Sequence, residues 1–329
     1  MILQIVPEPP ATLGGVRAYA QRLQALAPDT FTPPVHGTRD ALIGRQGPEV
    51  DAGAAATILL HYSNYGFDPA GRPDWLPEVV ERWRQEGRTC VVFFHEVFAT
   101  GPPWRRAFWS ASAQRSIARR VARAASSALT SLPLYKSLLG RLAPGLSVEV
   151  LPLLSTVGEP YERPVLSARE PSLVLFGSSG LRLRAYRTFG RALGTACRAL
   201  GVTRILDIGP LDDQIRSSAA QASTPVEHRG VLEDCDVSSA LRTSRTGFLA
   251  YPPEFLGKST VYAAFAAHGL LPIVAWHESG KPASDRPPCA TAESVVLGDI
   301  QEIADAAHAW YEGHRAARHL ETYRQLFDH

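Results

Sequence analysis

The sequence has almost no excess of charge of either sign. Its 329 residues include 34 Lys and Arg and 32 Asp and Glu, which gives a formal net charge of +2 at pH 7. A protein that binds nucleic acid through its phosphates needs a strongly basic surface. The composition therefore argues against nucleic acid as a partner, and we expect none.

Cysteine and long apolar runs are also scarce. The four cysteines, Cys90, Cys197, Cys235 and Cys289, show neither a Cys-x-x-Cys pair nor the Cys/His spacing of a metal site. They are predicted to be buried free thiols, which suits a reducing compartment. No segment approaches the roughly 20 apolar residues of a membrane span. Met1–Val6 lacks the basic residues of a signal peptide and is predicted to be a buried strand, so we expect a cytoplasmic protein.

The chain does contain many short apolar runs that are predicted strands. In the first half they are Ile2–Val6, Thr57–His61, Val91–His95, Ala128–Ser131 and Val148–Leu151. In the second half they are Leu173–Phe176, Arg204–Ile208, Gly247–Tyr251 and Leu271–Ala275. Runs without polar alternation are typical of parallel strands that are covered on both faces. The pattern predicts an α/β fold of two Rossmann-like, doubly wound domains facing across a cleft.

Helices are predicted between these strands. They are Val16–Leu26, Trp75–Glu86, Ser112–Ala125, Ala185–Leu200, Ser259–His268 and a last helix from about Ile300. The polar, proline-bearing stretch Ser155–Glu170 marks the join between the halves. We therefore predict one domain over residues 1–160 and a second over 161–329, with the last helix able to pack back on the first domain.

Candidate ligand residues in the first half follow predicted strands. Gly14 and Gly15 precede a helix, so their amides could approach an anion or a sugar, although a plain tight turn explains them as well. Tyr65 follows one strand, and His95 with Glu96 follows the next, at the ends where α/β proteins bind ligands. A histidine there can hydrogen-bond a hydroxyl or a phosphate, and Glu96 can orient it or act as a base. A purely structural histidine is the alternative.

Two segments of the second half have the features of an anion site. The first places Gly177 and Ser178 directly after a strand and before three arginines, Arg182, Arg184 and Arg187. Small residues expose backbone amides, and arginine binds a diphosphate through two parallel hydrogen bonds. An exposed basic helix start is the alternative interpretation.

The second segment precedes an alanine-rich helix. Its candidate residues are Glu254, Gly257, Lys258, Ser259 and Thr260. The string Gly-Lys-Ser-Thr suggests a P-loop, but Pro252 stands where the leading glycine of that motif belongs. We predict instead an anion site at the start of the helix, formed by its amides and Lys258.

The carboxylates offer one candidate metal motif. Asp234 and Asp236 have Asp-x-Asp spacing, but no further ligand stands nearby in the sequence. A solvated loop is the favoured interpretation, so we predict neither a metal nor any other cofactor.

Arginines recur on one predicted helix. Arg115, Arg119 and Arg123 are four residues apart, and Arg120 stands beside them. They are predicted to form a solvated helix face. Alternatively, they dock weakly on anionic lipids at the inner membrane face, in a salt-sensitive way.

These placements resemble the GT-B glycosyltransferases, and more narrowly the retaining family-4-like members that build bacterial polysaccharides and glycolipids. The resemblance is carried by Gly14-Gly15, His95-Glu96, Phe176-Gly177, and the stretch Glu254–Gly269 with Leu271–Val274 after it. It implies transfer of a hexose-like sugar from a nucleotide-diphosphate-sugar to a saccharide or lipid-linked acceptor, with retention at the anomeric carbon. The first domain would take the acceptor, with His95 touching the transferred sugar, and the second would bind the donor.

The resemblance also implies how the donor is held. Arg184 stands where the family has a lysine that grips the diphosphate, while Ser178 replaces the family's arginine. Leu256 and Ala264 stand where the family has two glutamates. Charge on the leaving group would be stabilised by Arg184 and Lys258 without a metal.

Other functions stay open. One is a catalytically inactive GT-B-like partner subunit, and another is a non-hydrolysing sugar-nucleotide epimerase. A nicotinamide enzyme is disfavoured because the glycine fingerprint is incomplete.

Overall fold

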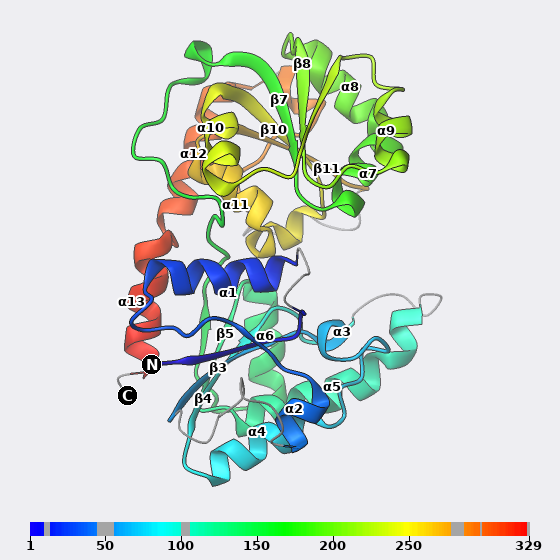
Figure 1. The fold of residues 1–329 in the computed structure, drawn as a ribbon. Helices are drawn as coiled ribbons and strands as arrows, with labels where there is room; N and C mark the ends of the chain where they lie inside the picture. The colour runs from blue at the N-terminus through cyan, green and yellow to red at the C-terminus, as the bar shows by residue number, and fades with distance from the viewer. Residues whose placement is uncertain (10–13, 45–55, 100–105, 278–285, 297, 328–329) are drawn as a thin grey trace. The chain divides into compact units, whose positions relative to one another are not determined.

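The computed structural model describes residues 1–9, 14–44, 56–99, 106–277, 286–296 and 298–327. The chain divides into two compact units (Figure 1). Unit 1 comprises Met1–Pro152 together with Ala317–His329, and unit 2 comprises Leu153–Ala316. The sequence-based boundary at residue 160 lies a few residues inside unit 2, and the end of the chain belongs to unit 1.

Unit 1 contains a six-stranded parallel sheet in the order β2-β1-β3-β4-β5-β6. Its strands are β1 (Leu3–Val6), β2 (Val35–His36), β3 (Thr57–Tyr62), β4 (Thr89–Phe94), β5 (Ser127–Thr130) and β6 (Val148–Val150). Its helices are α1 (Gly15–Leu26), α2 (Arg39–Gly44), α3 (Asn64–Phe67), α4 (Leu76–Gln85), α5 (Arg106–Ala124), α6 (Pro133–Leu142) and α13 (Ala316–Phe327). The central strands β1, β3 and β4 are almost wholly buried, as their unbroken apolar runs predict.

The strand order of unit 1 reverses direction between β1 and β3. From β1 the chain passes through α1 to β2 on one side, and from β3 it passes through α4, α5 and α6 to strands on the other side. Because such crossovers are right-handed, α1 covers one face of the sheet and α4 to α6 cover the other. The carboxyl-terminal helix α13 joins α1, where Tyr19 hydrogen-bonds His319 and Tyr323.

Unit 2 contains a five-stranded parallel sheet in the order β11-β10-β7-β8-β9. Its strands are β7 (Glu170–Phe176), β8 (Arg204–Ile208), β9 (Val226–Gly230), β10 (Ser244–Ala250) and β11 (Leu271–Ala275). Its α-helices are α7 (Ser179–Arg187), α8 (Gly190–Ala199), α9 (Asp213–Ala219), α10 (Asp234–Thr243), α11 (Thr260–Ala267) and α12 (Ile300–Glu312). Its 3-10 turns are η2 (Leu166–Ala168), η3 (Pro253–Lys258) and η4 (Ser294–Val296).

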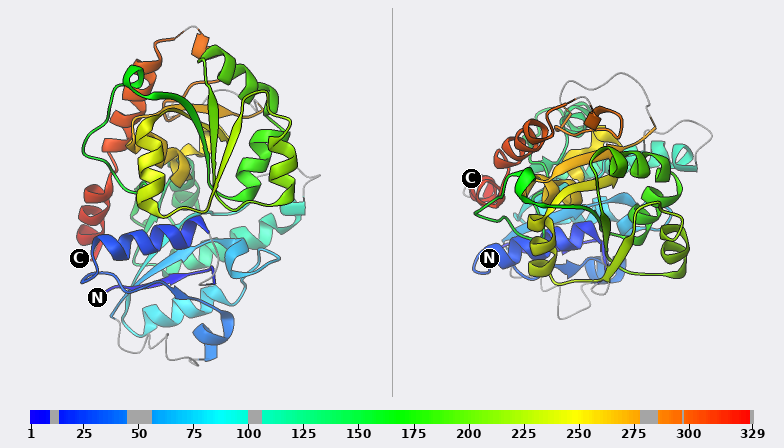
Figure 2. Two further views of the ribbon diagram at one scale, coloured as in Figure 1. Left: turned by 45° about the horizontal axis from the view of Figure 1, so that its top comes forward. Right: turned by 90° about the horizontal axis from the view of Figure 1, so that it is seen from above.

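Two apolar layers enclose this second sheet, and both views in Figure 2 show helices on its two sides. One core cluster joins the sheet to α7, α8 and α9, and the other joins it to α10, α11 and α12. Strand order reverses again, this time between β7 and β10. The prediction of two doubly wound α/β sheets is therefore confirmed.

Some local predictions were wrong. The segment Ala185–Leu200, predicted as one helix, forms the end of α7 and all of α8. Asp234 and Asp236 lie in the first turn of α10 instead of a loop, where acidic residues stabilise the helix dipole. Cys235 is exposed on the same helix, whereas Cys90 and Cys197 are buried as predicted. All four cysteines are free thiols.

Candidate functional site

The reversal of strand order in unit 2 marks a place where ligands bind in open α/β sheets, outside the carboxyl ends of the two strands concerned. β7 and β10 lie side by side, with Val174 opposite Gly247. The chain leaves β7 through Gly177 and Ser178, and it leaves β10 through Tyr251 and η3. Both segments that the sequence predicted as anion sites therefore lie at this switch point.

Two helix amino termini come together there. α7 begins after Ser178 and α11 begins after Ser259. A Cβ atom on Gly177 would lie 3.1 Å from Cγ2 of Val261, in the first turn of α11. Gly177 also has φ of +118°, a backbone conformation that favours glycine. The positive ends of two helix dipoles consequently face one small region, which favours a bound anion.

Arg182 has a different environment from the one the sequence suggested. Its side chain is 1% exposed and forms an ion pair with Asp207. Its Nε donates to the carbonyl of Gly177 at 3.1 Å, and Nη2 donates to the carbonyl of Pro210. The hydroxyl of Tyr186 donates to the second oxygen of Asp207 at 2.6 Å. Arg182 thus ties the turn after β7 to the turn after β8, and its guanidinium is buried in that role.

Arg184 is half-buried and extends toward the carboxyl ends of the strands. Its Nη1 donates to the carbonyl of Ala250, the last residue of β10, at 3.3 Å. Its Cζ lies 5.3 Å from the ring centroid of Trp276, which follows β11. Cation–π contact of this kind holds a guanidinium in place while leaving donors for a ligand. The sequence analysis did not select Trp276. Trp276 directly follows a strand, which is the same position that led to the selection of Gly177 and Ser178.

The segment before α11 supplies the second cation. Ser259 caps the helix, with its Oγ accepting a hydrogen bond from the amide of Tyr262 at 3.1 Å. Lys258 is half-buried, and its Nζ lies 5.9 Å from the ring centroid of Phe255. Thr260 begins the helix one residue after the cap, so its amide is among those that the helix itself does not satisfy.

The other residues of this segment that were predicted to bind the nucleotide-sugar donor are either buried or exposed at its periphery. Gly257 is buried, and its carbonyl accepts from the amide of Leu153 at 2.8 Å. Glu254 is exposed on η3. Ala264 and Leu256, which stand where the family resemblance calls for glutamates, are both fully buried in the core. A carboxylate at either position would need a partner in an apolar environment.

Unit 1 has an equivalent switch point between β1 and β3. A Cβ atom on Gly66, after β3, would lie 2.6 Å from Pro7, after β1, so the two loops are in contact. Tyr65 is 45% exposed in this region. The predicted glycine pair is adjacent, because Gly14 is the N-cap of α1 and Gly15 its first residue.

The amino terminus of α1 already holds an anionic group of the chain itself. Oε2 of Glu8 accepts from the amide of Arg17 at 2.5 Å, and Nε of Arg17 donates to the carbonyl of Glu8 at 3.1 Å. A Cβ atom on Gly14 would lie 2.0 Å from Oε1 of Glu8, so glycine is needed for this carboxylate to fit. Burial raises the pKa of Glu8, against the hydrogen bonds from Arg17 and Val16. Sequence reasoning missed Glu8, which also stands just after a strand.

His95 belongs to a buried hydrogen-bonded chain. Its Nε2 lies 3.2 Å from Nδ1 of His61, and Nε2 of His61 lies 3.3 Å from Oε1 of Gln4. Nε2 of Gln4 donates to the carbonyls of Ala20 and Thr32, so its Oε1 must accept from His61. His61 then carries its proton on Nε2, and His95 donates from its own Nε2. In the neutral ring of His95, Nδ1 is therefore a hydrogen-bond acceptor.

Burial keeps the middle of this chain neutral. It lowers the pKa of His61 to about 3.

Polar contacts join the loops that follow β3 and β4. Ser63 Oγ donates to Glu96 Oε2 at 3.2 Å, and Asn64 Nδ2 donates to the carbonyl of Val97 at 3.1 Å. The arrangement gives unit 1 a half-buried carboxylate and a histidine of fixed tautomer at the carboxyl end of β4.

One of the four arginines singled out on α5 forms an ion pair with a carboxylate. Arg120 donates to both carboxylate oxygens of Glu81, at 3.0 and 2.9 Å, and this contact raises the pKa of Arg120. Arg115, Arg119 and Arg123 are exposed. Glu81 thus neutralises one of the four arginines, and lipid contact by the others stays a prediction.

In the described part of the chain no helix is long and apolar enough to cross a membrane. Among the same residues, no three His, Cys, Asp or Glu side chains group together as metal ligands.

Comparison with known proteins finds similarity in structure alone. No family model matches the sequence, and no curated protein matches it. An α-glucosyltransferase in complex with UDP is similar to it at 9% identity, with 99% of this chain and 98% of that chain covered and a TM-score of 0.59. The match to an α-glucosyltransferase with UDP and a 13-mer DNA containing a HMU base is of the same quality, at 8% identity, 99% of both chains and a TM-score of 0.59.

Two further solved structures are similar over most of their length. Sucrose-phosphate synthase from Thermosynechococcus elongatus has 13% identity, with 99% of both chains covered and a TM-score of 0.62. A putative UDP-N-acetylglucosamine 2-epimerase from Listeria monocytogenes has 12% identity, with 94% of this chain and 90% of that chain covered and a TM-score of 0.54. At such identities the likeness concerns the fold: the chain has the two-sheet α/β fold of GT-B glycosyltransferases.

Proposed function

We propose that the chain is a glycosyltransferase that uses a nucleotide-diphosphate-sugar. The observation that carries this proposal is the switch point of unit 2, where the amino termini of α7 and α11 adjoin and Arg184 and Lys258 flank them. Backbone amides, helix dipoles and cations together favour the binding of a diphosphate. Two solved structures of the same fold, both described as α-glucosyltransferases, contain UDP, which supports the assignment.

In this proposal each donor residue has a defined task. The amides near Gly177 and Ser178, and those that follow Ser259, bind phosphate oxygens, while Arg184 and Lys258 compensate the charge of the leaving diphosphate. Arg182 acts as a positioning residue, because it shapes the turn at Gly177 from a buried ion pair. Glu254 and Thr260 stand at the periphery of the same site.

The chemistry requires an acceptor hydroxyl, which we assign to unit 1. The bond from the anomeric carbon to the donor phosphate breaks first, and its electron pair leaves with the nucleoside diphosphate. The hydroxyl oxygen then bonds to that carbon on the face that the diphosphate has left, so that the configuration is retained. The hydroxyl proton passes to a base, for which Glu96 and Nδ1 of His95 are the candidates in unit 1. Tyr65 and the Gly14-Gly15 turn lie at the same switch point. A saccharide or lipid-linked acceptor, a cytoplasmic location and retention at the anomeric carbon complete the proposal.

Thermal unfolding in the presence of UDP, GDP, ADP and their sugars tests this function. A ligand that binds the folded state raises Tm in proportion to the logarithm of its concentration. We expect one nucleotide series to stabilise the protein, and its sugar conjugate to release nucleoside diphosphate when an acceptor is supplied. Absence of stabilisation by every nucleotide would contradict the proposal.

A sugar-nucleotide epimerase is the second candidate, because a putative UDP-N-acetylglucosamine 2-epimerase shares the fold over 94% of this chain. Incubating UDP-N-acetylglucosamine with the protein in D₂O separates the two chemistries. An epimerase that removes and replaces a proton at C2 introduces deuterium there, whereas a transferase leaves that carbon unlabelled. Nucleotide binding without either reaction would favour the inactive partner subunit.

A further inference from the structure

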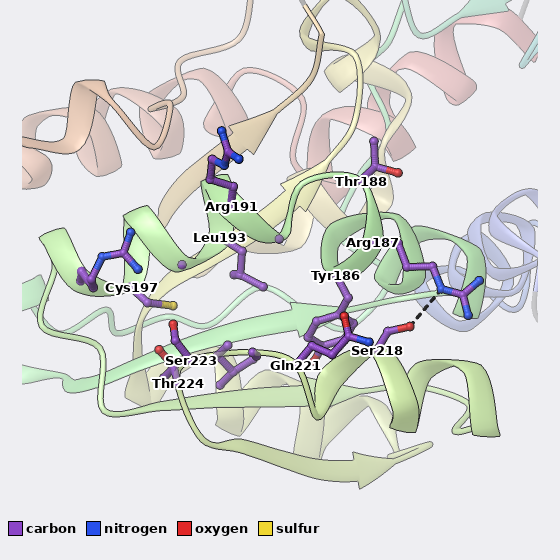
Figure 3. Close-up of a pocket in the computed structure, with 15 residues that line it drawn as sticks. Tyr186, Arg187, Thr188, Arg191, Leu193, Cys197, Ser218, Gln221, Ser223 and Thr224 are labelled. Carbon is purple, nitrogen blue, oxygen red and sulfur yellow. Dashed lines mark hydrogen bonds between the residues drawn. The ribbon is translucent and has the colours of Figure 1, made fainter.

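Unit 2 contains a cavity of about 660 Å³ that is separate from the switch point. It is a partly open pocket lined by the end of α7, one face of α8, the end of α9 and the loop before β9 (Figure 3). Its volume lies within the range of small-molecule sites, roughly 300–1,000 Å³. The polar side chains that line it include Arg187, Arg198, Ser218, Ser223 and Thr224.

The cavity lies at the opposite end of the sheet from the proposed donor site. Ile205, near the start of β8, and Thr224, just before β9, both line it. The donor site is instead at the carboxyl ends of the strands, beyond Phe176. Helix α7 runs from one end to the other, and its nine residues span about 12 Å at a rise of about 1.5 Å per residue. A ligand in one place therefore does not occupy the other.

The charge of the lining is of one sign. Among the described residues that line the cavity, three are arginines and none is acidic. Nε of Arg187 donates to Oγ of Ser218 at 3.0 Å, the contact drawn in Figure 3. Ser218 is itself buried, so its hydroxyl is a fixed part of the wall. The third arginine, Arg191, points away from Ser218 and Thr224 in Figure 3, and we assign it no contact.

Two exposed polar side chains, Arg198 and Ser223, meet beside α8. A Cβ atom on Gly194 would lie 3.4 Å from Nη1 of Arg198 and 3.5 Å from Oγ of Ser223, so both groups converge beside this glycine. Nη2 of Arg198 donates to Thr195 Oγ1 at 3.3 Å, which orients the guanidinium. Guanidinium and hydroxyl donors around a space without a side chain suit a phosphate group.

Gly194 itself has no structural requirement to be glycine. It lies within α8, and the contacts that an added Cβ would make are ordinary ones. A helix-interior glycine is less stable than alanine by about 1 kcal/mol. Leu193, Ile205 and Tyr186 give the rest of the wall an apolar character, which suits the carbon skeleton of a ligand.

We propose that this cavity binds a small phosphorylated molecule. Its phosphate lies against Arg198, Ser223 and Gly194, and its remaining part extends toward Arg187 and Ser218. The site is distinct from that of the nucleotide donor and does not depend on the proposed transfer reaction.

Isothermal titration of the full chain with inorganic phosphate and with glucose 6-phosphate tests this site. Each titration is made at constant ionic strength, with and without excess UDP. We expect one equivalent of glucose 6-phosphate to bind in both conditions, more tightly than inorganic phosphate. Arg198→Ala and Ser223→Ala should weaken binding, the first by roughly tenfold or more.

Two controls locate the binding. Arg216→Ala removes an exposed arginine of α9 that does not line the cavity, and it should leave the affinity unchanged. Arg184→Ala should also leave it unchanged. If glucose 6-phosphate fails to bind, or if Arg216→Ala weakens it as much as Arg198→Ala, the cavity is not a phosphate site. Competition by UDP together with loss in Arg184→Ala would assign the binding to the donor site and overturn this proposal.

Discussion

Arg182 and Asp207 form a buried ion pair that holds the turn after β7 against the turn after β8. Each side chain is 1% exposed, and the residues are 25 positions apart in the sequence. Two further donors of Arg182 bind the carbonyls of Gly177 and Pro210, and the second oxygen of Asp207 accepts from Tyr186. The proposed donor site therefore rests on a group of polar contacts that is satisfied within the protein.

The first prediction concerns this ion pair. Asp207→Ala leaves the guanidinium of Arg182 buried without its counter-charge, and it should lower the free energy of unfolding by about 3–5 kcal/mol. Urea denaturation measures the change. Glu170→Ala is the matched control, because it breaks an ion pair with Arg204 whose side chains are 52% and 42% exposed. That control should cost less than about 1 kcal/mol, and equal losses in the two variants would contradict the assigned role.

The second prediction concerns the close approach of the two turns. Gly209 has φ of +142°, and a Cβ atom there would lie 2.3 Å from the carbonyl oxygen of Gly177. Gly209→Ala should therefore lower the free energy of unfolding by at least about 2 kcal/mol. Gly140→Ala in α6, where an added Cβ meets nothing within 4 Å, should instead be neutral or stabilising by up to about 1 kcal/mol. Thermal unfolding of both variants distinguishes the two outcomes.

The third prediction concerns pH. The pKa of His61 is about 3 in the folded protein against 6.5 for the ordinary side chain, so the unfolded chain binds a proton that the folded protein does not. Its contribution to stability is complete above pH 6.5 and is lost as the pH falls from 6.5 toward 3, by about 1.4 kcal/mol per pH unit. His61→Gln should lose less stability between pH 6 and pH 4.5 than the parent protein does. An unchanged slope would show that His61 does not titrate as described.

The fourth prediction concerns the docking of α13. Nε2 of His319 lies 3.0 Å from the carbonyl of Pro152 and donates to it, so its Nδ1 accepts from the hydroxyl of Tyr19 at 2.8 Å. Tyr19→Phe leaves that buried nitrogen without its donor, and it should cost about 1–3 kcal/mol. Hydrogen exchange should accelerate in Ala316–Phe327 more than in β3. Uniform acceleration would indicate global destabilisation instead.

Much of the fold followed from the sequence, because buried parallel strands read as short, mainly apolar runs without regular polar alternation. Arg204–Ile208 and Leu271–Ala275 have the predicted bounds. The edge strand β9 was missed because Val226–Gly230 contains Glu, His and Arg and is only half-buried. The break between α7 and α8 was missed because no proline or polar cluster interrupts the periodic pattern there.

The place of the candidate residues in the fold followed from the sequence, whereas their contacts did not. Residues that follow strands lie beside the switch points, since topology fixes that edge of the sheet, and their binding of a ligand stays a prediction. The pairing of Arg182 with Asp207 could not be inferred, because nothing in the local sequence shows which arginine will be buried. The same holds for Glu8, which occupies the turn at Gly14 that the sequence suggested for an acceptor.

The most direct test of the account is the affinity of the stabilising nucleotide for three variants, measured by isothermal titration. Arg184→Ala and Lys258→Ala should each weaken binding by roughly 10- to 100-fold, because each removes a charged donor worth about 1.5–3 kcal/mol. Arg119→Ala, an exposed arginine of α5, should leave the affinity unchanged. Undiminished binding in both Arg184→Ala and Lys258→Ala would contradict a donor site at the switch point of unit 2.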